Sequence, residues 1–174
     1  MNRINHLTAT LAGVLLAGAC ANPVVVSVPK NLEPAPDEAL RMVARAKGVQ
    51  LYECRTKAGA AEAEWAFVGP EADLFDVRGR TIGRHGAGPT WELADGSAVR
   101  ATVKERADAP LYGAIPWLLL AAKPYGAEGE LSKVSSIQRV NTVGGVAPTG
   151  GCDRTKVGQP VRVAYTADYV FFAR

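Results

Sequence analysis

The chain has 174 residues, of which 48% are hydrophobic and 21% are charged, a composition ordinary for a globular protein with one domain and one core. Its net charge is only +3, and the basic residues are dispersed, with Arg78, Arg80 and Arg84 the nearest thing to a cluster. Nucleic-acid-binding proteins carry a concentrated basic surface, so this pattern excludes nucleic acid as an expected partner.

Residues 1–19 have the pattern of an export signal. Arg3 precedes an apolar stretch at positions 7–16, and small residues at positions 17–19 lead to Cys20. The apolar stretch is too short to cross a bilayer as a stable helix. We therefore expect residues 1–19 to be a signal peptide and the mature protein to be exported to the cell envelope.

The six residues that end at Cys20, Leu-Leu-Ala-Gly-Ala-Cys, resemble a bacterial lipobox. In that motif the cysteine receives a diacylglyceryl group and becomes the mature N-terminus, which would make the membrane a partner through an N-terminal lipid. Ala17 stands where leucine is usual, so cleavage by ordinary signal peptidase, with Cys20 left as a free thiol, is the alternative. Ala21, in place of aspartate, favours an outer-membrane lipoprotein that faces the periplasm.

The chain has three cysteines, and one of them, Cys20, belongs to the lipobox-like motif. If Cys20 carries the lipid, Cys54 and Cys152 remain in a compartment where disulfides persist. We therefore predict a disulfide between Cys54 and Cys152.

Residues 20–36 are expected to form the lipid anchor and a tether, because four prolines in residues 21–36 keep the chain semi-extended. A single domain should then occupy residues 37–174. Asp37 is a suitable N-cap for a short helix over residues 38–47, in which apolar residues form a broad stripe and which Gly48 would end.

From Val49 onward the pattern changes to short runs separated by turn residues. A turn is expected at Gly69-Pro70, and a hairpin at Asp95-Gly96, the dipeptide typical of a two-residue type I′ turn. The apolar run 116–122 fits either a buried strand or a short core helix. Strands are predicted at residues 49–54, 64–68, 75–77, 80–83, 90–94, 97–104, 133–142 and 161–172. The predicted fold class is mainly β, an antiparallel sandwich or barrel of about 8 to 10 short strands with one short N-terminal helix.

Several short motifs follow one another along the chain: residues 48–54 (GVQLYEC), 83–91 (GRHGAGPTW), 95–97 (DGS), 116–119 (PWLL), 137–142 (IQRVNT), 144–145 (GG), 151–153 (GCD) and 165–169 (YTADY). Together they resemble the exported bacterial and fungal family catalogued as domain of unknown function 3455, over about residues 48–172. The resemblance implies secretion and a single domain. It brings no established activity, cofactor or site residue.

His85 is the candidate catalytic residue, because histidine titrates near neutrality and serves in acid–base, nucleophile-assisting and metal roles. The other histidine, His6, lies in the signal peptide, so a site with two histidines is impossible in the mature chain. With Cys54 and Cys152 bridged, no metal is expected. No Gly-x-Ser-x-Gly motif supplies a serine nucleophile, so no catalytic residue is assigned, and the favoured role of His85 is to brace a turn.

The candidate ligand-binding residues are His85, Trp91, Arg139, Asn141 and Thr142. Tryptophan is more often a core residue than a sugar platform, and the polar residues at 139–142 could clasp an anion or a glycan or simply hold the loop that follows. The glycines of residues 83–88 are spaced somewhat like a dinucleotide fingerprint, but Pro89 opens a strand instead of a helix, so no cofactor is expected.

Two functional hypotheses remain. The favoured one is a lipid-anchored β domain that binds or scaffolds an unknown envelope ligand without catalysis. The rival is a hydrolase-like enzyme that uses His85 as general base. A concave pocket around His85 with a carboxylate partner would favour the enzyme.

Overall fold

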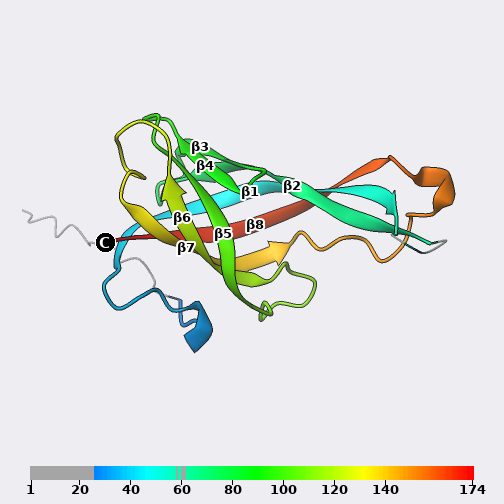
Figure 1. Ribbon diagram of the computed structural model, residues 1–174, viewed down its shortest axis with the longest axis horizontal. Coiled ribbons are helices and arrows are strands. Elements are labelled where there is room, and N and C mark those ends of the chain that lie inside the picture. Colours follow the sequence, from blue (N-terminus) through cyan, green and yellow to red (C-terminus); the bar gives the residue numbers. More distant parts are fainter. Residues whose placement is uncertain (1–25, 58, 60–61) are drawn as a thin grey trace, which may run out of the picture.

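The structure is a computed structural model that describes residues 26–57, 59 and 62–174, and these form a closed antiparallel β-barrel of eight strands (Figure 1). Each strand pairs with the next along the chain, and β1 also pairs with β8 to close the barrel. The predicted mainly β, antiparallel fold is confirmed, and the architecture is the barrel rather than the sandwich. The predicted signal peptide and Cys20 lie outside the described residues.

The strands are β1 (Ala39–Thr56), β2 (Ala63–Phe75), β3 (Thr81–Gly86), β4 (Thr90–Leu93), β5 (Ala98–Ala107), β6 (Trp117–Pro124), β7 (Val134–Gly144) and β8 (Pro160–Ala173). The described helical segments are two single-turn 3-10 helices, η1 (Lys30–Leu32) and η2 (Arg154–Lys156). Among the described residues, no helix is long and apolar enough to cross a membrane.

Residues 38–47 do not form the predicted helix, because β1 begins at Ala39. Side chains along this stretch alternate: Met42, Ala44 and Ala46 pack in the core, whereas Arg41, Arg45 and Lys47 are exposed. Helix propensity is a weak preference. Here it is outweighed by backbone pairing of β1 with β8 along one edge and, from Arg45, with β2 along the other.

The predicted turn at Gly69-Pro70 is also absent, since β2 runs through both residues as one strand. The register between β1 and β2 shifts after Leu51, so that Val68 is the extra residue of a bulge. Pro70 has no N–H to donate, and β2 pairs with β3 only from Ala72 onward. The proline therefore lies where the second edge of β2 needs no ladder hydrogen bond.

The hairpin predicted at Asp95-Gly96 is present and joins β4 to β5. Gly96 has a φ of +84°, but Asp95 does not enter the left-handed region, so the turn is not type I′. The Asp95 carboxylate accepts hydrogen bonds from the Ser97 backbone N–H and hydroxyl and from the backbone N–H of Glu130. These bonds tie the hairpin to the loop before β7.

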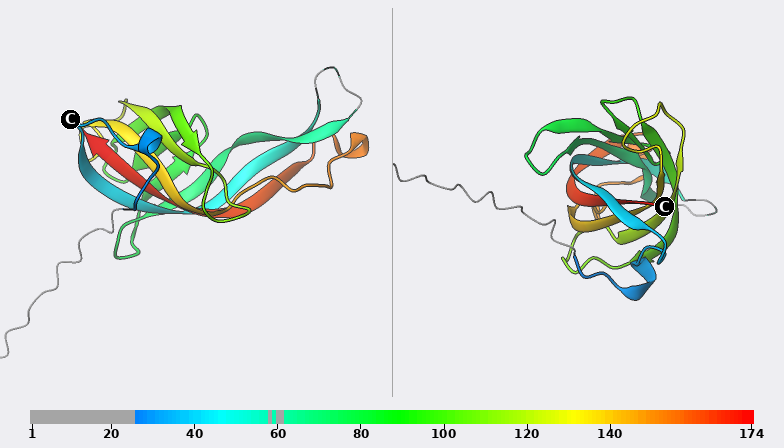
Figure 2. Two further views of the ribbon diagram at one scale, coloured as in Figure 1. Left: turned by 90° about the horizontal axis from the view of Figure 1, so that it is seen from below. Right: turned by 90° about the vertical axis from the view of Figure 1, so that its left-hand side faces the viewer.

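The apolar run at 116–122 forms a strand from Trp117 onward, as the first part of β6, and it is apolar on both faces because other parts of the protein cover both. Leu118 and Leu120 pack in the barrel core, whereas Trp117 and Leu119 point outward against the fully buried Leu32 of η1. The segment from Val26 to Glu38 lies along the outside of the barrel (Figure 2). Its backbone is held there by the Gln138 side-chain nitrogen, which donates to the Leu32 carbonyl at 2.6 Å.

Three strands continue beyond the barrel as an arm, which we define as residues 51–56 of β1, 63–69 of β2 and 160–164 of β8, together with the loop 146–159 (Figure 1). The pairing of β2 with β3 and of β7 with β8 stops before this region, so the arm stands apart from the ring of strands. Its tip carries η2 (Figure 2).

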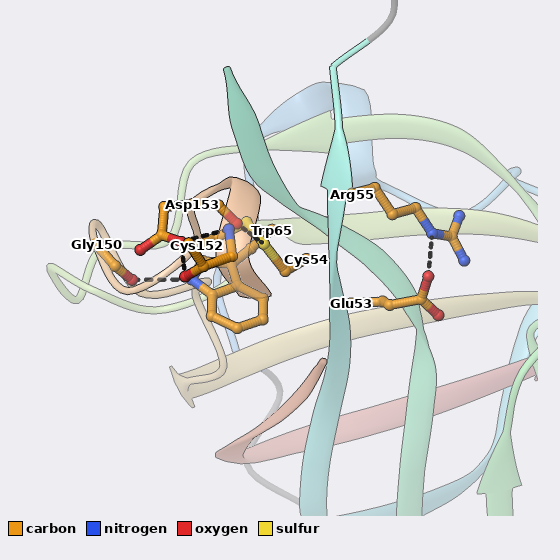
Figure 3. The surroundings of a disulfide bond; sticks show 8 residues. Glu53, Cys54, Arg55, Trp65, Gly150, Cys152 and Asp153 are labelled. Carbon is orange, nitrogen blue, oxygen red and sulfur yellow. Dashed lines mark hydrogen bonds and ion pairs between the residues drawn. A yellow bond between two sulfur atoms is a disulfide. The ribbon is translucent and has the colours of Figure 1, made fainter. Parts of the chain in front are cut away.

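The predicted disulfide between Cys54 and Cys152 is confirmed and joins the middle strand of the arm to the loop (Figure 3). The Trp65 indole N–H donates to the Gly150 carbonyl at 2.9 Å, which fixes the same loop to β2. The backbone of Cys54 also exchanges hydrogen bonds with residues 158 and 159. The long connection from β7 to β8 is thereby attached to the arm at several points.

We predict that Cys54→Ser and Cys152→Ser each lower the free energy of unfolding by a similar amount, about 4 kcal/mol, because each removes the cross-link that closes a loop of 98 positions. The double variant should lose no more than either single one. Chemical denaturation of the three variants and of the reduced wild type measures this. Clearly additive losses would show that the cysteines stabilise the fold independently of each other.

Candidate functional site

The barrel lumen contains a cluster of aromatic rings from three strands. The His85 ring of β3 stacks on the fully buried Trp91 of β4, with ring centroids 4.3 Å apart. Tyr169 of β8 meets both rings edge-on, at 4.8 Å and 5.2 Å. The contact between His85 and Trp91 follows from register, since the two residues lie directly opposite each other in the β3–β4 ladder. The outcome is a rigid aromatic wall inside the barrel.

A cavity of about 190 Å³ lies beside this wall, where the lumen meets the arm. Its apolar lining consists of Phe67, Val68, Gly69, Pro70, Gly88, Pro89, Val103, Leu118 and Leu120. Its polar lining comes from Gln50, His85, Trp91, Arg139 and Tyr169, which belong to five different strands. A mostly apolar pocket with a few convergent polar groups is the usual form of a small-molecule site.

Three of the polar side chains have buried atoms that find no hydrogen-bond partner among the described residues. These atoms are the Gln50 Nε2, the Trp91 Nε1 and the Tyr169 hydroxyl. Each residue is 2% exposed or less. Burying a donor without a partner costs about 1–3 kcal/mol, and three of the five such atoms among the described residues belong to residues that line this one cavity.

The Tyr165 hydroxyl is buried without a partner as well. The Tyr169 hydroxyl is near enough to Tyr165 and Arg139 for both to act on its pKa, yet no hydrogen bond of acceptable geometry joins them. Burial raises the pKa of both phenols, Tyr165 strongly, so both remain protonated. They are therefore potential donors at neutral pH.

His85 is 4% exposed, and its Nδ1 lies 2.8 Å from the Thr90 carbonyl oxygen across the β3–β4 turn. A carbonyl only accepts, so we assign the proton to Nδ1, which leaves Nε2 with its lone pair. Burial lowers the His85 pKa to about 4, so the ring is neutral at neutral pH. The described partner of the ring is a backbone carbonyl rather than a carboxylate.

Arg139 of β7 is half-buried, and its Nε and Nη2 donate to the Pro116 carbonyl at 3.1 Å and 2.8 Å. Within the described residues it forms no ion pair with Asp or Glu. Burial lowers its pKa, and the positive charge of Arg106 acts in the same direction. The guanidinium therefore brings a positive charge to the cavity without a carboxylate from the protein.

Of the five residues expected to bind a ligand, His85, Trp91 and Arg139 come together at this cavity. The other two do not. Asn141 is exposed, with a φ of +50°, and its Nδ2 donates to the Asp168 carboxylate at 2.8 Å. Thr142 is buried, and its hydroxyl donates to the Ile115 carbonyl at 2.6 Å. Both side chains therefore have partners within the fold.

Sequence reasoning missed Gln50 and Tyr169 as site residues. Two signals could have found them. The alternation in residues 161–172 predicts that Tyr169 lies on the same face of its strand as Tyr165 and Phe171, and this face is the buried one. Gln50 continues the inward series that contains Ala44 and Ala46, so a polar side chain at that position is anomalous.

A second, larger hollow of about 570 Å³ lies beside the first residues of the arm. It is open and lined by charged residues of both signs, among them Glu71 and Arg162, which form an ion pair at 2.7 Å. No residue on its lining has a buried polar atom without a partner. The smaller cavity in the lumen is therefore the better candidate site.

The described residues place no serine, threonine or cysteine side chain on the lumen cavity. Ser97 donates to Asp95 in the β4–β5 hairpin, and Ser136 donates to Glu38 on the outside of the barrel. No group of three His, Cys, Asp or Glu side chains within residues 26–57, 59 and 62–174 could hold a metal ion. The cavity therefore presents hydrogen-bond donors, one neutral imidazole and apolar surface.

The family model described as "Protein of unknown function (DUF3455)" matches residues 34–173 of this chain. The chain belongs to this family. The match begins just after η1 and includes all eight strands, so the family corresponds to the complete barrel with its arm. No curated protein and no solved structure matches the chain.

The lowered pKa of His85 predicts a pH dependence of stability. Between pH 6.5 and about 4, the unfolded chain binds a proton at His85 that the folded chain does not. The free energy of unfolding should therefore fall as the pH falls through this window. We expect the wild type to lose on the order of 2 kcal/mol more than His85→Gln between pH 7 and pH 4.5.

Urea denaturation of both proteins at several pH values makes this comparison. Carboxylates with lowered pKa values, such as Glu38 and Asp95, titrate in both proteins and cancel in the difference. NMR titration of the His85 ring gives its pKa directly. Parallel stability curves, together with an ordinary histidine pKa, would contradict the burial of a neutral ring.

Proposed function

We propose that the protein is a lipid-anchored β-barrel of the cell envelope that binds a small molecule in its lumen without catalysing a reaction. The observation that carries this proposal is the set of three buried, unpartnered polar atoms, on Gln50, Trp91 and Tyr169, around a cavity of about 190 Å³. A core selected only for stability would replace such groups by apolar ones or supply partners.

The size and walls of the cavity support a small ligand. An engineered protein cavity of about 150 Å³ binds benzene, so a cavity of this volume suits a molecule of roughly ten non-hydrogen atoms. Phe67, Val68 and Val103 line it and are each about half exposed, which provides an apolar rim open to solvent. A ligand could enter there, at the base of the arm.

The geometry of the site supports ligand binding better than the rival hypothesis of a hydrolase with His85 as general base. The His85 ring is held by a backbone carbonyl and stacked on Trp91, and no serine, threonine or cysteine side chain lines the cavity among the described residues. A general base also works best with a pKa near the working pH, whereas that of His85 is lowered to about 4. We therefore assign His85 a bracing role with one free acceptor atom.

Two buried glutamines provide a matched test. Gln50 lacks a partner for its Nε2, whereas the Gln138 Nε2 donates to the Leu32 carbonyl. Gln138→Met should lower the free energy of unfolding by about 1–3 kcal/mol, because it leaves that carbonyl unpaired. Gln50→Met, of nearly the same volume, should leave stability unchanged or raise it.

The effects on binding should be reversed. We expect benzamide, a neutral probe with a carbonyl acceptor, to bind the wild type and Gln138→Met equally and Gln50→Met about 5- to 10-fold more weakly. Ligand-observed NMR and calorimetry measure this. If Gln50→Met destabilises the fold as much as Gln138→Met and leaves binding unchanged, the side chain has a structural role and the proposal loses its basis.

The membrane anchor requires its own test, because Cys20 lies outside the described residues. We expect the wild type, made in a bacterium that processes lipoproteins, to enter the detergent phase on phase separation and to carry an acyl mass on its N-terminal peptide. Cys20→Ser should remain in the aqueous phase with the same melting temperature. An aqueous wild type with an unmodified N-terminal cysteine would indicate ordinary signal peptidase cleavage.

A further inference from the structure

We infer that the ligand of the lumen cavity is a small monocarboxylate, with its carboxylate group directed to Arg139 and Gln50 and its apolar body against Leu118 and Leu120. The inference rests on the proposed binding function and specifies the chemical class of the ligand. Its support comes from the hydrogen-bonding types that line the cavity, from their charge and from the cavity volume.

The polar groups around the cavity are mainly donors. The Gln50 Nε2 carries two N–H groups and the Trp91 Nε1 carries one, and none of these has a partner among the described residues. The Tyr169 hydroxyl is a further potential donor. The His85 Nε2 is an acceptor, because the His85 proton is assigned to Nδ1. A carboxylate only accepts hydrogen bonds and matches this excess of donors.

The charge at the cavity is positive. Arg139 is the charged residue on its lining, and neither Asp nor Glu belongs to that lining. The Arg139 Nε and Nη2 donate to the Pro116 carbonyl, and the guanidinium also interacts with the Tyr169 hydroxyl. A guanidinium carries more N–H groups than these contacts use, so it has donors left for a ligand. A half-buried cation without a counter-ion is costly, and an anion bound beside it removes part of that cost. Hydrogen bonds between a guanidinium and a carboxylate are also among the strongest in proteins.

The apolar part of the cavity lining limits the chemistry of the ligand beyond its carboxylate group. Most lining residues are apolar, including Phe67, Leu118 and Leu120, and they offer no hydrogen bonds to a sugar or a second charged group. A glycan would bring several hydroxyls that need acceptors as well as donors. With a volume of about 190 Å³, the cavity favours one charged group on a compact apolar body.

Three probes with one ring and different charge test the inference. Benzoate is an anion with two acceptor oxygens, benzamide is its neutral analogue, and benzylamine is a cation of similar size. Calorimetry on the wild type should show benzoate binding at least about 10-fold more tightly than benzamide, with benzylamine not bound. The preference should decrease as salt increases, because it is partly electrostatic.

Substitutions of Arg139 and of Arg100 test whether Arg139 is the residue that causes the preference for benzoate over benzamide. Arg139→Gln should weaken benzoate about 10- to 100-fold and benzamide only slightly, which removes the discrimination between them. Arg139→Lys keeps the charge without the planar fork and should retain part of it. Arg100→Gln makes the same charge change at an exposed position, where Arg100 covers the Tyr125 ring, and should bind both probes as the wild type does.

The outcomes separate the two proposals. Equal binding of benzoate and benzamide by the wild type overturns the carboxylate inference and leaves the binding function intact. Binding of none of the probes at about 10 mM overturns both, because a site built for this class should exceed such weak affinity. If Arg139→Gln does not fold, the comparison of Arg139→Lys with the wild type and Arg100→Gln decides, because a discrimination in Arg139→Lys as large as that of the wild type overturns the inference. Unchanged discrimination in Arg139→Lys and Arg139→Gln assigns the preference to other groups and overturns the inference.

Discussion

The pairing of β1 on both of its edges is the interaction on which the rest of the structure depends. Its first half closes the barrel between β2 and β8, and its second half forms the middle of the arm. Gly48 lies where the two halves meet, opposite Ala72 on β2 and Tyr165 on β8. A Cβ atom at Gly48 would lie within 2.1 Å of the Glu71 carbonyl oxygen, so only glycine permits these strands to approach so closely.

This geometry also determines where the cavity lies. Gln50 follows Gly48 on the inward face of β1, at the point where β2 loses its β3 neighbour and bulges. The lumen is therefore not filled completely at its arm end, and side chains from all eight strands border the remaining space. The disulfide stabilises the arm from the other side, since it joins Cys54 of β1 to the loop that leads into β8. Barrel closure, cavity and cross-link are thus consequences of one continuous strand.

The polarity of the lumen has an energetic cost that packing alone does not explain. Donors on Gln50, Trp91 and Tyr169 give up water on folding and receive no partner from the described protein, and the Arg139 charge lacks a counter-ion there. Stability is commonly sacrificed in this way where a protein must bind a ligand. The cross-link of a long loop and the docking of Leu32 against the outer face of β6 contribute in the opposite direction.

The sequence by itself determined the features whose causes are local. Alternation in residues 161–172 predicted the two faces of β8, Asp95-Gly96 predicted the position of a hairpin, and the even pair of cysteines predicted the disulfide. The sequence also marked His85, Trp91 and Arg139 as candidates because histidine, tryptophan and arginine are chemically distinctive. Each of these inferences needed only a residue, its neighbours and its composition class.

Only the tertiary structure decided the features that depend on distant partners. Residues 38–47 have both a helical stripe and a strand alternation, and pairing with β8, more than a hundred positions away, selected the strand. Gln50 and Gln138 are both buried glutamines, yet one has a carbonyl partner and the other has none. That difference is set by which backbone group the fold brings within about 3 Å of a side chain, and no local pattern carries this information.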